Sequence, residues 1–203
     1  MERVLTTKKY ESPLSQKFAD LQSIRRDLNK SIEMLNLLKP ELEKSNENTN
    51  TTLIESIWSA SVIRYCRCYA SGKRYGLDET IFEGLPGDAL GVHRWVKGMR
   101  DKLIAHSVNP FEECKTIIMT ADEDIPKSWG IGFFDAHYAH PNLDGMANFC
   151  NLTVVLRDKV ANLCNKVQSE LQIEVNNLKP EELKNLPKHE YVAPLPEKAE
   201  TSR

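Results

Sequence analysis

Two long apolar stripes at helical spacing constrain the fold of this 203-residue chain more than any other feature. In each stripe apolar residues recur mainly at steps of three, four and seven, which is the spacing of one face of an α-helix. Two long helices with one apolar face each bury those faces most simply against each other, so the stripes predict two walls of a helical bundle. The first stripe comprises Leu14, Phe18, Leu21, Leu28, Ile32, Leu35 and Leu38, and the second comprises Phe149, Leu152, Leu156, Val160, Leu163, Val167 and Leu171.

Capping and breaker residues indicate where the helices begin and end. Ser12 followed by Pro13 is a start signal, because serine caps the first turn and proline suits the first helical position. Pro40 is expected to end that helix, since its ring cannot continue the backbone ladder. The next helix is apolar around much of its circumference, which predicts that it is the most buried. The predicted helices cover about residues 12–40, 52–71, 88–109 and 141–177.

The periodicity changes between the third and fourth predicted helices. Residues 115–120 and 129–134 are rich in β-branched and aromatic side chains, which favours a β-hairpin with a long loop. A lone two-stranded ribbon is only marginally stable, so this hairpin is expected to lean on the bundle or to pair with a partner. The predicted fold class is therefore all-α: an antiparallel bundle of four main helices, with a small β-hairpin inserted before the last long helix.

The chain divides into one domain with two tails. Residues 1–11 lack periodicity and predict a mobile lead-in, and residues 12–178 form the helical domain. Residues 179–203 are rich in Pro, Glu and Lys, which predicts a flexible tail, with one short helix beginning near its start. The connection over residues 72–89 contains several glycines and a proline and is a candidate flap beside the third helix.

Composition excludes several classes of protein. The net charge is −2, so nucleic acid would have to bind through a local basic patch. No apolar run is long enough to cross a bilayer and no export signal opens the chain, which predicts a cytoplasmic protein with five reduced cysteines. Asp135, His137 and His140 lie close together but lack a second cluster to complete a coordination shell. We therefore expect neither a metal nor a cofactor.

One constellation in the third predicted helix maps onto a known chemistry: Arg100, Asp101 and His106. Histidine titrates near neutrality, so His106 could give or take a proton. Arginine offers a planar fork of donors, so Arg100 could hold a phosphodiester and stabilise charge on it, with Asp101 orienting one of them. The alternative is structural: a histidine in the last turn complements the helix dipole, and Arg100 and Lys102 are solvated.

Helical geometry separates the two central side chains. Six residues at 3.6 per turn place Arg100 and His106 roughly 120° apart around the axis and about 9 Å apart along it. The two side chains therefore flank the apolar stripe and do not bond each other. A site that uses both is most easily completed by a second surface, either another helix or a second copy of the chain.

The sequence Arg100-Asp101, four residues, His106 resembles the R-x4–6-H motif of the HEPN superfamily, and its wider context resembles an abortive-infection, AbiU-type branch. The resemblance implies a helical bundle that dimerises with its motif helices facing each other. It implies a metal-independent endoribonuclease, in phage defence or a toxin–antitoxin pair, that leaves a 2',3'-cyclic phosphate. Some members of the superfamily are catalytically silent and bind partners, so an antitoxin or another protein partner is also implied.

Further residues are candidates for contact with a polyanionic substrate. Arg64 and Arg67 share one side of the second helix, and with Lys73 and Arg74 they form a run of basic residues. The structural alternative is that Arg64 and Arg67 pair with acidic groups such as Glu55 or Asp101. Lys102 and His93 lie in the motif helix and complete the candidates, although solvent exposure is the favoured interpretation of His93. Tyr65, Tyr69 and Tyr75 could stack on bases, but core packing is favoured for them.

Two functional hypotheses follow. The first is a metal-independent endoribonuclease, expected to be homodimeric in the family's manner, which requires His106 close to Arg100 in a basic cleft. The second is a non-catalytic module that binds nucleic acid or a partner protein, which tolerates either residue being buried or salt-bridged.

Overall fold

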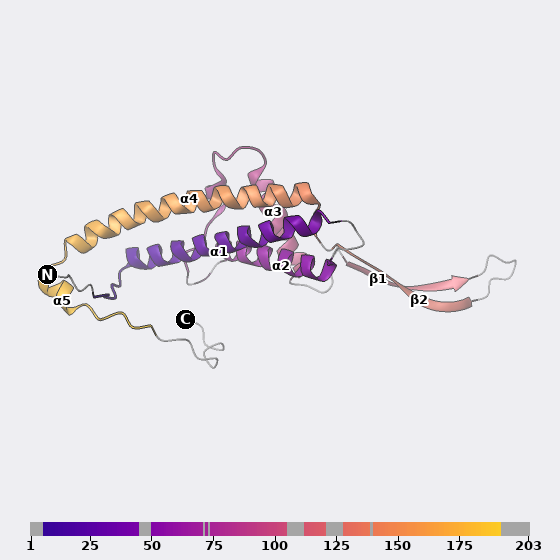
Figure 1. The fold of residues 1–203 in the computed structure, drawn as a ribbon, viewed down its shortest axis with the longest axis horizontal. Coiled ribbons are helices and arrows are strands. Elements are labelled where there is room, and N and C mark those ends of the chain that lie inside the picture. The colour runs from indigo at the N-terminus through magenta and orange to yellow at the C-terminus, as the bar shows by residue number, and fades with distance from the viewer. Residues whose placement is uncertain are drawn as a thin grey trace.

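The computed structural model describes residues 6–44, 50–70, 72, 74–104, 112–120, 128–138 and 140–191. The described chain is mostly helical and carries one antiparallel two-stranded hairpin, as the sequence predicts (Figure 1). Its elements are α1 (Pro13–Leu42), α2 (Thr51–Cys66), η2 (Arg67–Tyr69), η3 (Glu79–Phe82), α3 (Ala89–Met99), η4 (Arg100–Ile104), β1 (Glu112–Thr120), β2 (Ser128–His137), α4 (Leu143–Asn176) and α5 (Pro180–Asn185).

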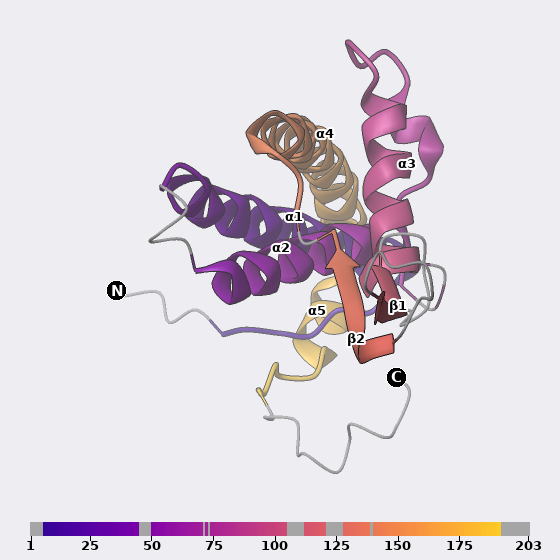
Figure 2. The same ribbon diagram turned by 90° about the vertical axis from the view of Figure 1, so that its right-hand side faces the viewer.

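The two apolar stripes pack against each other as α1 and α4, which run antiparallel (Figure 1). At one end Tyr10, just before α1, donates a hydrogen bond from its hydroxyl to Glu174 near the end of α4. Toward the other end the Cys150 thiol of α4 contacts the side-chain oxygen of Asn36 in α1. Helix α2 lies along α1, and α3 crosses the other helices steeply (Figure 2).

Helix α1 begins as predicted but does not end at Pro40. The Ser12 side chain accepts a hydrogen bond from the Ser15 backbone N–H, and the Ser15 hydroxyl oxygen accepts one from the Ser12 backbone N–H, which closes a capping box. The helix then continues through Pro40 to Leu42. Proline removes only its own backbone donor, and the last turn is held by packing because Leu38 is buried and Leu42 contacts the core. The predicted end was therefore two residues early.

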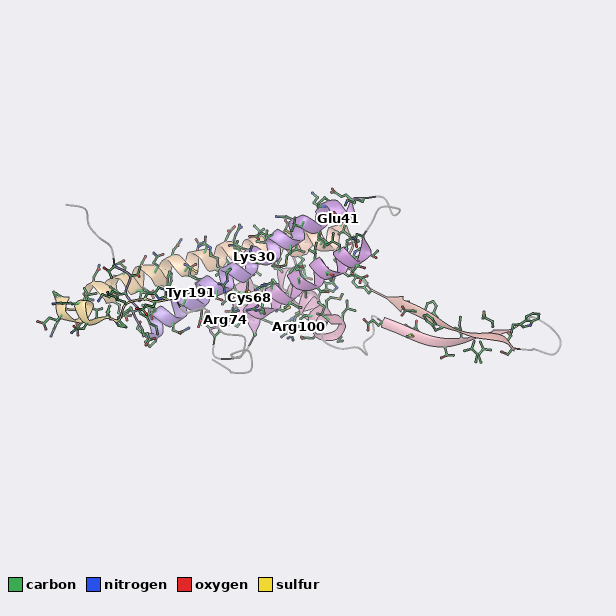
Figure 3. The ribbon with its side chains drawn as sticks, turned by 60° about the horizontal axis from the view of Figure 1, so that its bottom comes forward. Lys30, Glu41, Cys68, Arg74, Arg100 and Tyr191 are labelled. Carbon is green, nitrogen blue, oxygen red and sulfur yellow. The ribbon has the colours of Figure 1, made fainter. Side chains whose placement is uncertain are left out.

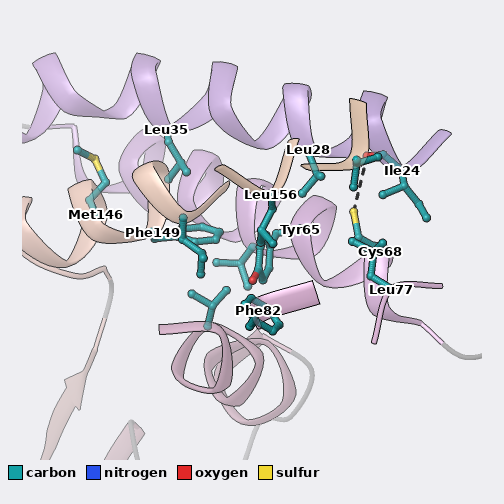
Figure 4. Close-up of a cluster of buried hydrophobic side chains, with 14 of the residues drawn as sticks. Ile24, Leu28, Leu35, Tyr65, Cys68, Leu77, Phe82, Met146, Phe149 and Leu156 are labelled. Carbon is teal, nitrogen blue, oxygen red and sulfur yellow. Dashed lines mark hydrogen bonds between the residues drawn. The ribbon is translucent and has the colours of Figure 1, made fainter. Parts of the chain in front are cut away.

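The core forms where α2 is enclosed by α1, α3 and α4 (Figure 4). Trp58 and Tyr65 of α2 are fully buried, and both rings meet Phe149 of α4 edge-on. Helix α2 ends at Cys66 and the chain tightens into the 3-10 turn η2, so the second predicted helix is slightly shorter than expected. Cys68 of this turn is buried against the Ile24 carbonyl of α1.

The motif helix begins as predicted. The Asp88 carboxylate accepts a hydrogen bond from the Gly91 backbone N–H and caps α3. At Arg100 the helix widens into a single π-helical stretch, η4, a variation that is common at functional sites. The predicted end at Asn109-Pro110 and the side chain of His106 lie outside the described residues.

The hairpin extends beyond the end of the helices (Figure 1). Strands β1 and β2 pair from Glu112 opposite His137 to Thr120 opposite Ser128, with a bulge beside Met119. Every residue of β1 is exposed. Strand β1 therefore does not pack against the bundle, which was one of the two ways in which the hairpin was expected to be stabilised.

The two tails meet beside α5. Lys8 forms a β-bridge with Lys188, and the Lys8 ammonium donates hydrogen bonds to the carbonyls of Lys184 and Leu186. These contacts join parts of the chain that the sequence analysis assigned to the lead-in and to the flexible tail. Among the described residues no helix is both long and apolar enough to span a membrane.

Trp58 supports a stability prediction. Its ring is fully buried, and its Nε1–H has no hydrogen-bond partner among the described residues. Trp58→Ala should lower the free energy of unfolding by about 3–5 kcal/mol, because it opens a cavity. Trp58→Phe keeps much of the packing and removes the unpaired donor, so it should cost less than half as much. Denaturant unfolding would measure both changes, with Leu37→Ala at an exposed position as the control. Equal losses of stability for all three variants would contradict the role of Trp58 as a core residue.

Candidate functional site

The arginine of the motif lies at the junction of α3 and η4, near the surface (Figure 3). One terminal nitrogen of Arg100, Nη1, donates a hydrogen bond to Asp101 Oδ1 at 2.7 Å. Both side chains are about half exposed. The hydrogen bond to Asp101 raises the pKa of Arg100, so the guanidinium is charged at every relevant pH.

Arg100 and Asp101 line a pocket of about 410 Å³ between the end of α2 and the motif helix. The lining contains three cations, Arg67, Lys97 and Arg100, against the single carboxylate of Asp101. Three positive charges and one negative charge leave a formal charge of +2. Concave sites of this kind concentrate anions, and guanidinium groups bind phosphate oxygens in particular. The remaining lining residues are Ile63, Cys66, Tyr69, Ala70 and His93.

His93 forms part of the inner wall of this pocket and is only 2% exposed. The expected solvent exposure was wrong, because α3 is rotated so that His93 packs among aromatic rings. The ring centroids of Tyr69 and Phe82 lie 4.4 Å and 4.7 Å from that of His93. Burial lowers the pKa of His93 to about 4, so its imidazole is neutral near pH 7.

A short hydrogen-bond chain joins His93 to Tyr65 and Tyr69. The Tyr69 hydroxyl donates to the Tyr65 oxygen at 3.4 Å, and the Tyr65 hydroxyl lies 3.0 Å from His93 Nδ1. The Tyr65 hydroxyl and His93 Nδ1 are therefore hydrogen-bond partners, whichever of the two donates. His93 is thus a buried polar link between α2 and α3 rather than a proton donor near neutrality.

Cys66 is the one thiol in the pocket lining. Burial raises its pKa to about 12, and the opposing effect of Arg100 is smaller. The thiolate is the reactive form of cysteine, so Cys66 is not a candidate nucleophile. All five cysteines are free, and among the described residues no group of three or more His, Cys, Asp or Glu side chains could hold a metal ion.

The basic run around Arg64 and Arg67 is anchored by a carboxylate that the sequence analysis did not identify. Asp27 of α1 is fully buried, and Arg64 Nη1 lies 3.0 Å from its Oδ1. Arg74 Nη1 and Arg67 Nε lie 3.2 Å and 3.6 Å from its Oδ2. The sequence analysis had suggested Glu55 or Asp101 as the acidic partner of Arg64 and Arg67, but the buried partner is Asp27. One sequence signal was available, because Asp27 is an acidic residue inside an apolar helical stripe.

The basic residues predicted from the sequence have two different roles in the structure. Arg64 faces Asp27 and does not line the pocket, whereas Arg67 does both, because only its Nε is directed at Asp27. Lys102 is exposed on η4 and is not among the pocket-lining residues, and Lys73 lies outside the described residues. Lys97 was missed, although its position three residues before Arg100 places it on the same side of the helix.

The tyrosines follow the favoured interpretation in part. Tyr65 is fully buried, whereas Tyr69 is partly buried against the core and also lines the pocket. Tyr75 is 40% exposed, and the Lys17 ammonium lies 5.4 Å from its ring centroid. Tyr75 stands apart from the pocket that Arg100 lines.

Comparison of the chain with protein-family models, with curated proteins and with solved structures found no match.

His93 should make stability depend on pH. Its pKa is about 4 in the folded chain and about 6.5 when unfolded, so the unfolded chain binds more protons between these values. The contribution of His93 is therefore fully present above pH 6.5 and is lost as the pH falls toward 4, by up to about 3 kcal/mol. His93→Phe should remove this part of the pH dependence. Urea unfolding of both proteins from pH 4 to pH 8 would test it, and parallel profiles would contradict it.

Asp27 should contribute far more to stability than an exposed acidic partner of arginine. Asp27→Ala leaves three arginines without their shared carboxylate and should cost about 3 kcal/mol. Asp158 pairs with Arg157 on the surface of α4 and provides the control, because Asp158→Ala should cost less than about 1 kcal/mol. Chemical denaturation would measure both changes, and similar losses would show that Asp27 is not the anchor.

Proposed function

We propose that this chain is a HEPN-like, metal-independent endoribonuclease built on the antiparallel helices α1 and α4, with α2 along α1 and α3 crossing them. The observation that carries the proposal is the convergence of Arg67, Lys97 and Arg100 on one pocket. A net positive pocket beside an exposed arginine suits the backbone of a single RNA strand, since phosphate contacts supply most of the affinity in such complexes. The sequence motif supplies the remaining group, His106.

In the proposed reaction Arg100 binds a non-bridging oxygen of the scissile phosphate. The ribose 2'-oxygen attacks phosphorus, and the bond from phosphorus to the 5'-oxygen breaks. His106 accepts the 2'-hydroxyl proton or protonates the departing 5'-oxygen, and the products are a 2',3'-cyclic phosphate and a 5'-hydroxyl. Arg100 stabilises the charge that develops on the phosphorane, with Arg67 and Lys97 holding neighbouring phosphates.

Two proton transfers require two proton-carrying groups, and the neutral, buried His93 does not meet that requirement near pH 7. We therefore place the second transfer on His106 of a second copy, in a homodimer. Within the proposal the protein is cytoplasmic and acts in phage defence or in a toxin–antitoxin pair, where an antitoxin or another protein partner would restrain it.

The alternative function is a non-catalytic module that binds nucleic acid or a partner protein. The observation that favours it is the 2.7 Å contact of Arg100 with Asp101, which occupies part of the guanidinium fork. A paired arginine still binds phosphate through its remaining donors, but it is less free to follow charge that develops in a transition state.

The two functions are separated by one assay. Purified protein is incubated with labelled single-stranded RNA and tRNA in EDTA, and cleavage and binding are measured on the same samples. Arg100→Ala should lower kcat/KM by about 10²–10³, and His106→Ala by about 10²–10⁴. His106→Ala should leave RNA affinity within about threefold, whereas Arg100→Ala should weaken it as well.

Arg157→Ala is the matched control. Arg157 also pairs with the aspartate that follows it, at 2.8 Å, but it lies on α4 away from the pocket, so this variant should cleave normally. RNA binding without cleavage in the wild-type protein would favour the module. If the wild type neither binds nor cleaves RNA, both assignments are wrong.

A further inference from the structure

The hairpin carries an apolar surface that no described part of the chain covers. Four of its side chains are 64–75% exposed, although each would normally be buried in a protein of this size. They are Ile118 at 64%, Trp129 at 72%, Phe133 at 73% and Ile131 at 75%. Scattered exposed apolar residues need no explanation, but a contiguous group of this kind marks an interaction site.

Strand register places these four residues on one face of the ribbon, which we call the Trp129 face. Ile118 is opposite Ile131, and Phe133 lies two residues further along the same strand. At the bulge both Ser128 and Trp129 are opposite Thr120, which lies on the same face as Ile118. The four side chains are therefore neighbours, with the Ile118–Ile131 pair at the centre.

The opposite face of the ribbon is partly covered by its own side chains. It carries Gly130 and Gly132, and the side chains of Met119 and Ile117 lie across them. A Cβ atom added at Gly130 would stand 2.9 Å from the Met119 terminal methyl, and one at Gly132 would stand 3.4 Å from Ile117. The two faces are thus unequal in degree, because Ile117, Phe134 and Met119 on the opposite face are 43%, 47% and 52% exposed, against 64–75% for the four residues of the Trp129 face.

We propose that the Trp129 face is a homodimer interface, in which the hairpins of two copies pack face to face. The centre of this face has no charged side chain, so its complement must also be apolar, and a second copy supplies one of equal size and shape. In a two-fold symmetric dimer the same patch is used on both copies, so each residue of the face contributes to the buried area twice and no further copy can add to the contact. Stacking two ribbons also provides the second layer that a lone two-stranded hairpin lacks.

The area corresponds to a weak, reversible contact. An aromatic side chain carries about 150–250 Å², so the exposed parts of Trp129 and Phe133 amount to roughly 300 Å² per chain. The two isoleucines bring this to about 400–500 Å², and burial on both copies to roughly 800–1,000 Å². That total approaches the lower bound of specific protein–protein interfaces. The dimer should therefore be reversible and depend on concentration.

The position of the hairpin leaves it free to make this contact. Its strands contact chiefly each other, and it extends beyond the end of the helices (Figure 1). Substitutions on the Trp129 face should therefore change association without unfolding the helical core. The proposal stands independently of ribonuclease activity, since it rests on the apolar face alone.

Light scattering after gel filtration should show a concentration-dependent dimer for the full chain. Trp129→Ser with Phe133→Ser should raise the dimer Kd by about 100-fold or more, because two aromatic side chains per copy lose their burial. Leu37→Ser and Ile173→Ser are matched controls, since both residues are 63% exposed on helices, and neither should change the Kd. Circular dichroism should show unchanged helix content in every variant.

Crosslinking tests the face directly. In a Cys114→Ser background, Ile131→Cys should form an intermolecular disulfide on mild oxidation, because residue 131 lies at the centre of the contact. Ile117→Cys, on the opposite face of the neighbouring strand, should not. Trp129 also reports burial, since Trp58 is buried and Trp95 is partly buried, so tryptophan emission should shift to the blue as the dimer forms.

Three results would overturn the proposal. The first is a monomer at every accessible concentration, which would assign the face to a different protein. The second is a dimer that survives the double serine substitution. The third is a crosslink at residue 117 that is as efficient as the one at residue 131.

Discussion

The contact between Tyr65 and His93 is the interaction on which the pocket depends. It joins α2 to α3 inside an aromatic cluster, and Phe149 of α4 packs edge-on against Tyr65 from the other side. A buried imidazole is tolerated there because it is neutral and hydrogen-bonded. With α3 held in this rotation, Lys97 and Arg100 face the end of α2, where Arg67 lies, and the cationic pocket follows.

The buried carboxylate of Asp27 holds together the basic residues between α1 and the end of α2. Asp27 of α1 is fully buried, and a buried carboxylate needs charged or hydrogen-bonding partners, so Arg64, Arg67 and Arg74 gather around it. Three guanidinium groups exceed the charge of one carboxylate. The excess remains available to an anion, and Arg67 links the structural cluster to the pocket because it contributes to both.

The helical framework and the hairpin differ in whether their apolar residues are buried within the chain. Leu28, Leu35 and Phe149 find partners within the chain, because long helices with one apolar face can pair. Strand residues such as Ile131 and Phe133 remain exposed, since a two-stranded ribbon has no second layer of its own. One chain thus combines a self-contained core with an apolar surface that no described residue covers.

Local patterns in the sequence determined the long helices, the caps at Ser12 and Asp88 and the hairpin, because each depends on near neighbours. They also identified Arg100 and Asp101, although His106 lies outside the described residues and its role stays a prediction. Only the tertiary structure decided that His93 is buried, that Asp27 anchors the arginines and that Lys97 joins the pocket. Those outcomes depend on the rotation of one helix against another, and side chains distant in sequence set that rotation through packing and desolvation.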